Sequence, residues 1–128
     1  MKPLKSRGVC IEKTGVAVSD WQVFKIPELM EKVAGSEPRI FEFLKKRSMS
    51  CMVYRLPAGC KDLQAPHAED EVYVVLEGKA RLKLDETEHE VGPGYVLFVQ
   101  ATTEHSFFDI EEDLTLLAFF GPANPGRH

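Results

Sequence analysis

The 128-residue chain has the length of one ordinary domain, and its 44% hydrophobic and 28% charged residues are typical of a folded globular protein rather than a disordered one. The formal net charge of −4 argues against a nucleic-acid partner, because the one basic cluster, Lys45-Lys46-Arg47, is short and resembles a solvated turn. No apolar run approaches the roughly 20 residues that cross a bilayer. No apolar stretch follows the basic start either, so we expect a cytoplasmic protein without a membrane partner.

The first 38 residues are predicted to form an irregular arm and one short helix, both packed outside the main domain. Pro27 suits the first turn of this helix and Gly35 its end. The apolar residues Leu29, Met30 and Val33 lie between them and give the helix one face that can pack.

Residues 39–122 are predicted to be β-structure, followed by a flexible tail at 123–128. Runs of β-branched and aromatic residues are separated at short intervals by turn residues, and about eight short strands with almost no helix indicate a sandwich or barrel. The expected strands are Arg39–Lys45, Met49–Leu56, Glu71–Leu76, Ala80–Leu84, His89–Val91, Val96–Val99, His105–Asp109 and Leu114–Phe120. The aromatic residues expected in the core are Tyr54, Tyr73, Phe107 and Phe119.

The segment His67-Ala68-Glu69-Asp70-Glu71 leads into an apolar strand and carries side chains that bind metals. Alternate residues of an extended chain share a face, so positions 67, 69 and 71 project together. One strand cannot surround an ion, and His105, which opens another strand after a polar loop, is the best-placed further ligand.

Two imidazoles and one carboxylate leave coordination positions open to a substrate or O₂. This donor set suits one divalent ion of Fe, Mn, Ni or Zn, whereas a closed structural zinc site would use four protein ligands, usually including cysteine. The sequence therefore predicts a metal with a functional role, held by His67, Glu71 and His105.

The same residues resemble the two motifs of the cupin superfamily, over about residues 49–120. The residues that match the first motif are Gly59, His67, Glu71 and Gly78, and those that match the second are Gly94 and His105. Ala65 stands where the family has its first histidine, so the ligand set is reduced to three, and Gln64, Glu69 or water could supply a fourth oxygen.

The resemblance implies an all-β fold, the cupin double-stranded β-helix (jelly-roll barrel), of the small single-domain kind. Together with the unpaired edges of such sheets, it also implies a homodimer. The expected function is that of a mononuclear metalloenzyme of the dioxygenase, isomerase or lyase class, acting on a small polar or oxygenated substrate with Glu69 or Tyr73 as acid or base. The alternatives are a non-catalytic module that binds a small molecule and a barrel that has lost its metal.

Overall fold

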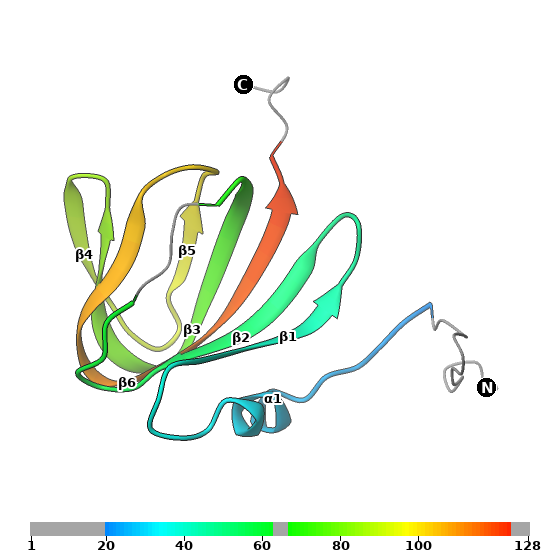
Figure 1. Ribbon diagram of the computed structural model, residues 1–128, viewed down its shortest axis with the longest axis horizontal. Helices are drawn as coiled ribbons and strands as arrows, with labels where there is room; N and C mark the ends of the chain where they lie inside the picture. Colours follow the sequence, from blue (N-terminus) through cyan, green and yellow to red (C-terminus); the bar gives the residue numbers. More distant parts are fainter. Residues whose placement is uncertain (1–19, 63–66, 124–128) are drawn as a thin grey trace.

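The computed structural model describes residues 20–62 and 67–123, and it confirms the predicted all-β fold (Figure 1). One short helix precedes six strands, and within the described ranges no helix is long and apolar enough to span a bilayer. The elements are α1 (Ile26–Lys32), β1 (Arg39–Lys45), β2 (Ser50–Leu56), β3 (Glu69–Leu84), β4 (Thr87–Val91), β5 (Val96–Val99) and β6 (His105–Pro122).

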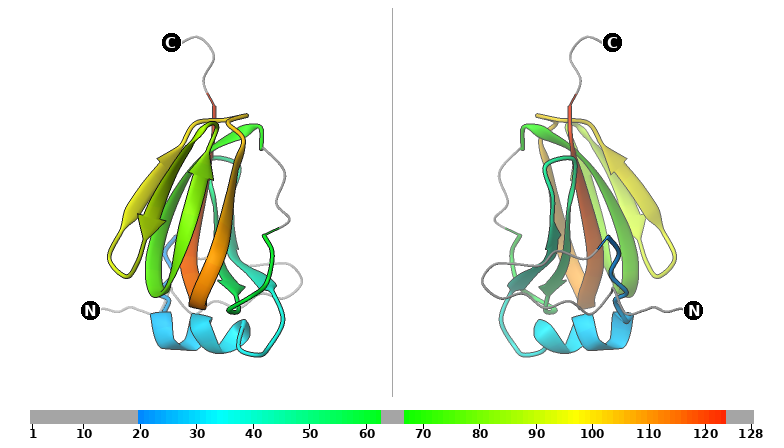
Figure 2. Two further views of the ribbon diagram at one scale, coloured as in Figure 1. Left: turned by 90° about the vertical axis from the view of Figure 1, so that its left-hand side faces the viewer. Right: turned by 90° about the vertical axis from the view of Figure 1, so that its right-hand side faces the viewer.

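The strands form one antiparallel sheet in the order β1-β2-β6-β3-β4, with β5 paired to β3. The two long strands β3 and β6 pair along almost their whole length, from Glu69 opposite Pro122 to Leu84 opposite His105. The views in Figures 1 and 2 show that these long strands bend and curl the sheet around its own concave face. The sheet therefore encloses a core in the manner of a jelly-roll barrel.

The bend in β3 lies at Gly78, where the sequence predicted a break between two strands. The pairing with β6 instead continues on both sides of this glycine, with register shifts between positions 75 and 81. Gly78 has a φ of +102°, and a Cβ at this position would collide with the backbone of Asp113 and Leu114 in β6. Gly78 is therefore a point where the two long strands lie too close for a side chain and turn together.

Arg55 of β2 forms ion pairs with residues of both long strands at this bend. The Arg55 guanidinium contacts the carboxylates of Asp113 at 2.9 Å and Glu77 at 3.5 Å, and its Nε–H donates to the Gly35 carbonyl. The Thr115 hydroxyl also donates to Glu77, at 2.8 Å. These contacts connect β2, β3 and β6 with the segment that follows α1.

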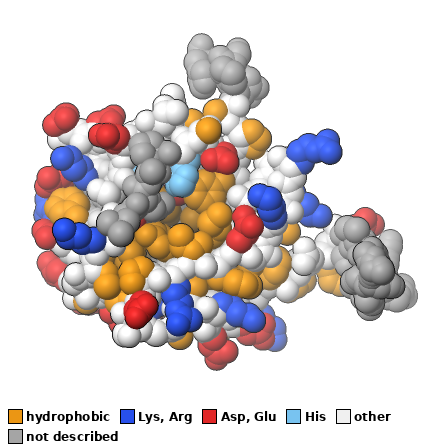
Figure 3. All heavy atoms as spheres, viewed as in Figure 1, with side chains coloured by type: hydrophobic (Ala, Val, Ile, Leu, Met, Phe, Trp, Pro, Cys, Tyr) orange, Lys and Arg blue, Asp and Glu red, His pale blue; other side chains and the backbone are white. Residues whose placement is uncertain are grey.

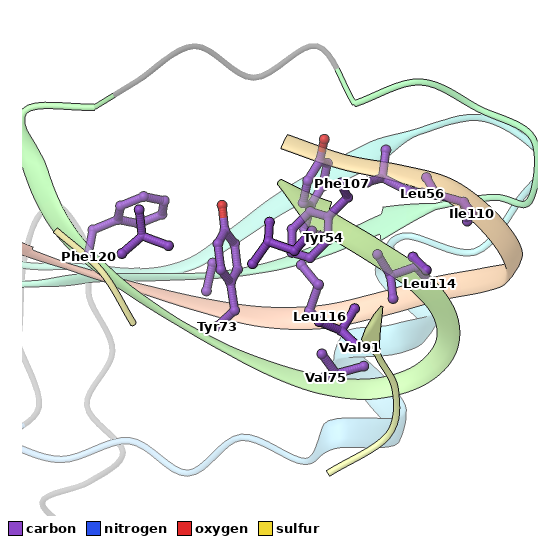
Figure 4. Close-up of a cluster of buried hydrophobic side chains, with 14 residues drawn as sticks. Tyr54, Leu56, Tyr73, Val75, Val91, Phe107, Ile110, Leu114, Leu116 and Phe120 are labelled. Atoms are coloured by element: carbon purple, nitrogen blue, oxygen red, sulfur yellow. The ribbon is translucent and has the colours of Figure 1, made fainter. Parts of the chain in front are cut away.

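The interior of the curled sheet holds the main hydrophobic core (Figure 4). A second, smaller cluster on the opposite face joins Leu29 and Val33 of the α1 segment to Val53 of β2, so the helix packs outside the sheet. The largest side chains of the main core are Tyr54, Leu56, Tyr73, Leu82, Phe107, Ile110, Leu114, Leu116 and Phe120.

Replacing Gly78 with alanine is expected to destabilise the fold, because the new methyl group meets backbone atoms and the residue must keep a positive φ. We expect the free energy of unfolding, measured by urea denaturation, to fall by more than about 2 kcal/mol. Gly94→Ala is the matched control, since Gly94 has a similar φ of +86° but open space at its Cβ. Equal losses in the two variants would show that the close approach at Gly78 does not matter.

Candidate metal centre

The three predicted metal ligands come from two places in the chain. His67 lies just before β3, Glu71 is the third residue of β3, and His105 is the first residue of β6. In the β3–β6 ladder Glu71 faces Phe120, whereas His105 faces Leu84 at the other end. The ladder alone would therefore keep Glu71 and His105 far apart.

Strand β5 and the curl of the sheet bring them together. Val99, the last residue of β5, pairs with Glu71, and the short turn 100–104 leads from there directly into β6. Ligand atoms of His67, Glu71 and His105 consequently all lie within 4.8 Å of one another. The structure thus gathers the three side chains into one cluster.

The buried half of this cluster is the pair formed by Glu71 and His105. The Glu71 Oε1 and His105 Nε2 atoms lie 3.2 Å apart, with side chains only 1% and 2% exposed, respectively. Two ligand atoms at right angles around an ion with bonds of about 2.1 Å are separated by about 3.0 Å, so the observed separation suits a shared cation.

The Glu71 carboxylate lacks the donors that a buried anion requires. Both of its oxygens are buried, and neither has a hydrogen-bond partner of adequate geometry within residues 20–62 and 67–123. A buried carboxylate without such a bond is costly, and either a proton on His105 or a cation bound between the two side chains compensates it. The residues present therefore fit a metal ion.

A backbone carbonyl fixes the orientation of the His105 ring. Its Nδ1–H donates to the Thr103 carbonyl at 2.9 Å, which directs Nε2 toward Glu71. Histidines that bind metals usually donate their second ring N–H in this way. The neighbouring Glu71 carboxylate raises the pKa of His105, and although burial opposes this rise, the Thr103 carbonyl adds to it.

Tyr73 lies beside the same imidazole. Its hydroxyl oxygen is 3.2 Å from His105 Nε2, and the side chain has no solvent exposure. Figure 4 shows the Tyr73 ring projecting from β3 into the interior, where it packs edge-to-face on Phe107 at 5.1 Å. A phenol is therefore held next to the candidate ligands in an apolar environment.

His67 forms the more open side of the cluster. It is only half-buried, and its ring packs edge-to-face on Phe120 with the centroids 5.1 Å apart. Figure 3 shows a histidine side chain at the surface, with hydrophobic side chains beside it, on the face viewed in Figure 1. The His67 side is therefore less buried than the Glu71–His105 side.

Of the other predicted site residues, Glu69 is described and is not part of this cluster. Glu69 is exposed at the start of β3, where it lines a separate cavity with the basic residues 45–47, and the structure does not bring it to the His105 ring. Gln64 lies outside the described residues, as does Ala65. The acid–base role of Glu69 and the ligand role of Gln64 remain predictions.

Sequence reasoning missed Phe120 as a neighbour of the site. Phe119 was expected in the core, yet it is only half-buried, while Phe120 is buried against His67. The alternation of Leu114, Leu116 and Ala118, all buried on one face, was the signal that could have identified Phe120.

Comparison with known proteins gives one family. The sequence profile described as the cupin domain matches residues 52–120. An uncharacterized protein of Streptomyces coelicolor is 39% identical over 101 residues, which cover 79% of this chain and 96% of that protein.

Solved structures at lower identity share the fold. A protein with a double-stranded β-helix domain from Klebsiella pneumoniae has a TM-score of 0.69 at 16% identity, over 82% of this chain and 93% of the other. The DMSP lyase DddQ from Ruegeria pomeroyi has a TM-score of 0.62 at 18% identity, over 66% of this chain but only 47% of the lyase. The profile match and the Streptomyces relative together show that this chain belongs to the cupin family.

Proposed function

We propose that this cupin is a small metalloenzyme that binds one divalent ion of Fe, Mn, Ni or Zn through His67, Glu71 and His105. The convergence of the three side chains and the unsatisfied carboxylate of Glu71 support this ligand set. Three protein ligands leave coordination positions for a substrate, which is the arrangement of a catalytic rather than a structural site.

The observation that carries the proposal of catalysis is the position of Tyr73. Its hydroxyl is buried among apolar side chains and lies 3.2 Å from His105 Nε2, beside the place where a substrate would bind. In an apolar environment such a hydroxyl can give a proton to, or take one from, a substrate held at the cluster. This placement favours reactions that move a proton, which are typical of isomerases and lyases, over oxygenation.

The remaining groups of the site would bind and shield a small polar or oxygenated substrate. When bound, the metal would supply Lewis-acid polarisation of a substrate oxygen. The buried rings of Phe107, packed on Tyr73, and Phe120, packed on His67, would give such a substrate apolar walls. DddQ, which has a similar fold, is named as a DMSP lyase. The shared fold alone does not transfer that activity to this chain.

Metal uptake tests the ligand set. After dialysis against Fe²⁺, Mn²⁺, Ni²⁺ or Zn²⁺, untagged protein should hold close to one ion per chain by elemental analysis. Glu71→Ala should lower the affinity by more than the 10–100-fold that is typical of losing an outer-shell partner. Glu69→Ala changes the same residue type on the same strand outside the cluster, and it should bind metal as the wild type does. The same trace metal in all three proteins would refute the ligand set.

Removal of one hydroxyl tests the role of Tyr73. We expect Tyr73→Phe to keep its metal and its packing on Phe107 but to slow proton exchange or turnover by about 10²–10⁴-fold. The measurement is proton NMR in D₂O of the metal-loaded protein with a panel of small diketones and hydroxy acids. Tyr54→Phe is the control, because Tyr54 is the other large buried tyrosine of the core and its hydroxyl donates to Asp62 instead.

A non-catalytic binding module would behave differently in this experiment. The wild type would then show a thermal shift with a member of the panel but no exchange or turnover, and Tyr73→Phe would change only the size of that shift. Such a result would reject the enzymatic proposal while leaving the metal centre intact.

We also propose that the protein is a homodimer. Strand β1 lies at the end of the sheet order and carries an exposed hydrophobic residue, Ile40, which is 56% exposed. An edge strand of this kind is readily covered by a second copy. Sedimentation equilibrium should give the mass of two chains at micromolar concentration, and a single-chain mass across that range would contradict the proposal.

A further inference from the structure

The β3–β6 ladder does not join the ligand-bearing ends of these two strands, and the pairing of β5 with β3 ends at Val99, before the turn 100–104 begins. His105 pairs with Leu84, at the end of the ladder remote from Glu71. Beyond Val99, contacts of the turn itself are what hold residues 100–104, and with them His105, against the start of β3.

Two consecutive backbone N–H groups of the turn make these contacts. The Ala101 N–H donates to the Asp70 carboxylate at 2.8 Å, and the Thr102 N–H donates to the His67 carbonyl at 2.7 Å. Both acceptors lie in the segment that carries His67 and Glu71. The turn is thus hydrogen-bonded to the backbone of one proposed ligand, His67, and to the residue that precedes another, Glu71.

Further hydrogen bonds connect the turn to the imidazole of His105. The Thr103 N–H donates to the Gln100 carbonyl at 3.1 Å, which closes the turn, and the Thr103 carbonyl accepts the His105 Nδ1–H. A series of hydrogen bonds therefore runs from Asp70 through the turn to the ring nitrogen opposite Nε2. Displacement of the turn would rotate the imidazole away from Glu71.

The conformation of the turn is one that requires outside support. Thr102 has a φ of +64°, in the left-handed region that a β-branched residue rarely adopts. Such conformations persist when surrounding contacts determine them, and they occur most often near functional sites. The half-buried Asp70 carboxylate forms no ion pair with Lys or Arg in the described ranges. Its hydrogen bond is the one that it accepts from the Ala101 N–H.

We propose that Asp70 is a positioning residue of the metal centre, which holds the turn 100–104 so that the Nε2 atom of His105 faces Glu71. This inference rests on the proposed metal site and adds a residue that touches neither the metal nor a substrate. It attributes to the hydrogen-bond acceptor at position 70, rather than to its charge, a direct effect on metal affinity.

The acceptor and the charge can be separated by two substitutions. Asp70→Asn keeps an oxygen that can accept the Ala101 N–H, whereas Asp70→Ala removes it. In titrations with Mn²⁺ and Zn²⁺, Asp70→Ala should bind 10–100-fold more weakly than the wild type, and Asp70→Asn should bind within about threefold of it. Asp113→Ala is the control, because the Asp113 carboxylate likewise accepts a backbone N–H, that of Ala58, but lies at the bend of the long strands. It should lose stability without losing metal affinity.

A second readout follows the imidazole itself in metal-free protein. Nitrogen-15 NMR of the ring should show the Nδ1–H form of His105 in the wild type and in Asp70→Asn, and its loss or exchange broadening in Asp70→Ala. Equal metal affinity in all the proteins would overturn the proposal, as would equal losses in both Asp70 variants. If the wild type binds no metal, the ligand set proposed above fails, while the His105 resonance still decides whether Asp70 positions the ring.

Discussion

A carboxylate buried without hydrogen-bond donors is the constraint on which the site depends. The two oxygens of Glu71 are shielded from solvent, and one of them lies 3.2 Å from a ring nitrogen, His105 Nε2. Because the other ring nitrogen donates to Thr103, Nε2 presents a lone pair to the carboxylate unless a positive charge lies between them. Either a proton or a metal ion can supply this charge, and the half-buried His67 on the third side favours the metal.

The shape of the sheet makes this encounter possible. Glu71 and His105 occupy opposite ends of the β3–β6 ladder, and they meet because both long strands bend where Gly78 lies against Asp113 and Leu114. The bend brings the two ends of the long strands near each other. The turn 100–104 and its hydrogen bond to Asp70 then set the position of His105 relative to Glu71. Fold stability and metal affinity should accordingly be sensitive to different residues.

The sequence predicted the class of the fold and the three converging side chains, but not how they converge. Alternation and turn residues located β1 and β5 correctly, since these signals are local. They divided β3 at Gly78, because a glycine that bends a continuous strand resembles one that ends it. The contact between Asp70 and Ala101 was invisible, since it depends on the register that places β5 beside β3. Similarly, Phe119 and Phe120 are adjacent in sequence, and only the pairing decides which one faces His67.

The central claim is that one cation belongs between His67, Glu71 and His105. Its most direct test is a crystal structure of the metal-loaded protein, with anomalous diffraction recorded on both sides of the absorption edge of that metal. The account predicts one strong edge-dependent peak per chain, in contact with Glu71 Oε1 and a nitrogen of each histidine. Edge-dependent density only elsewhere, with Glu71 and His105 unchanged and no ion between them, would contradict it.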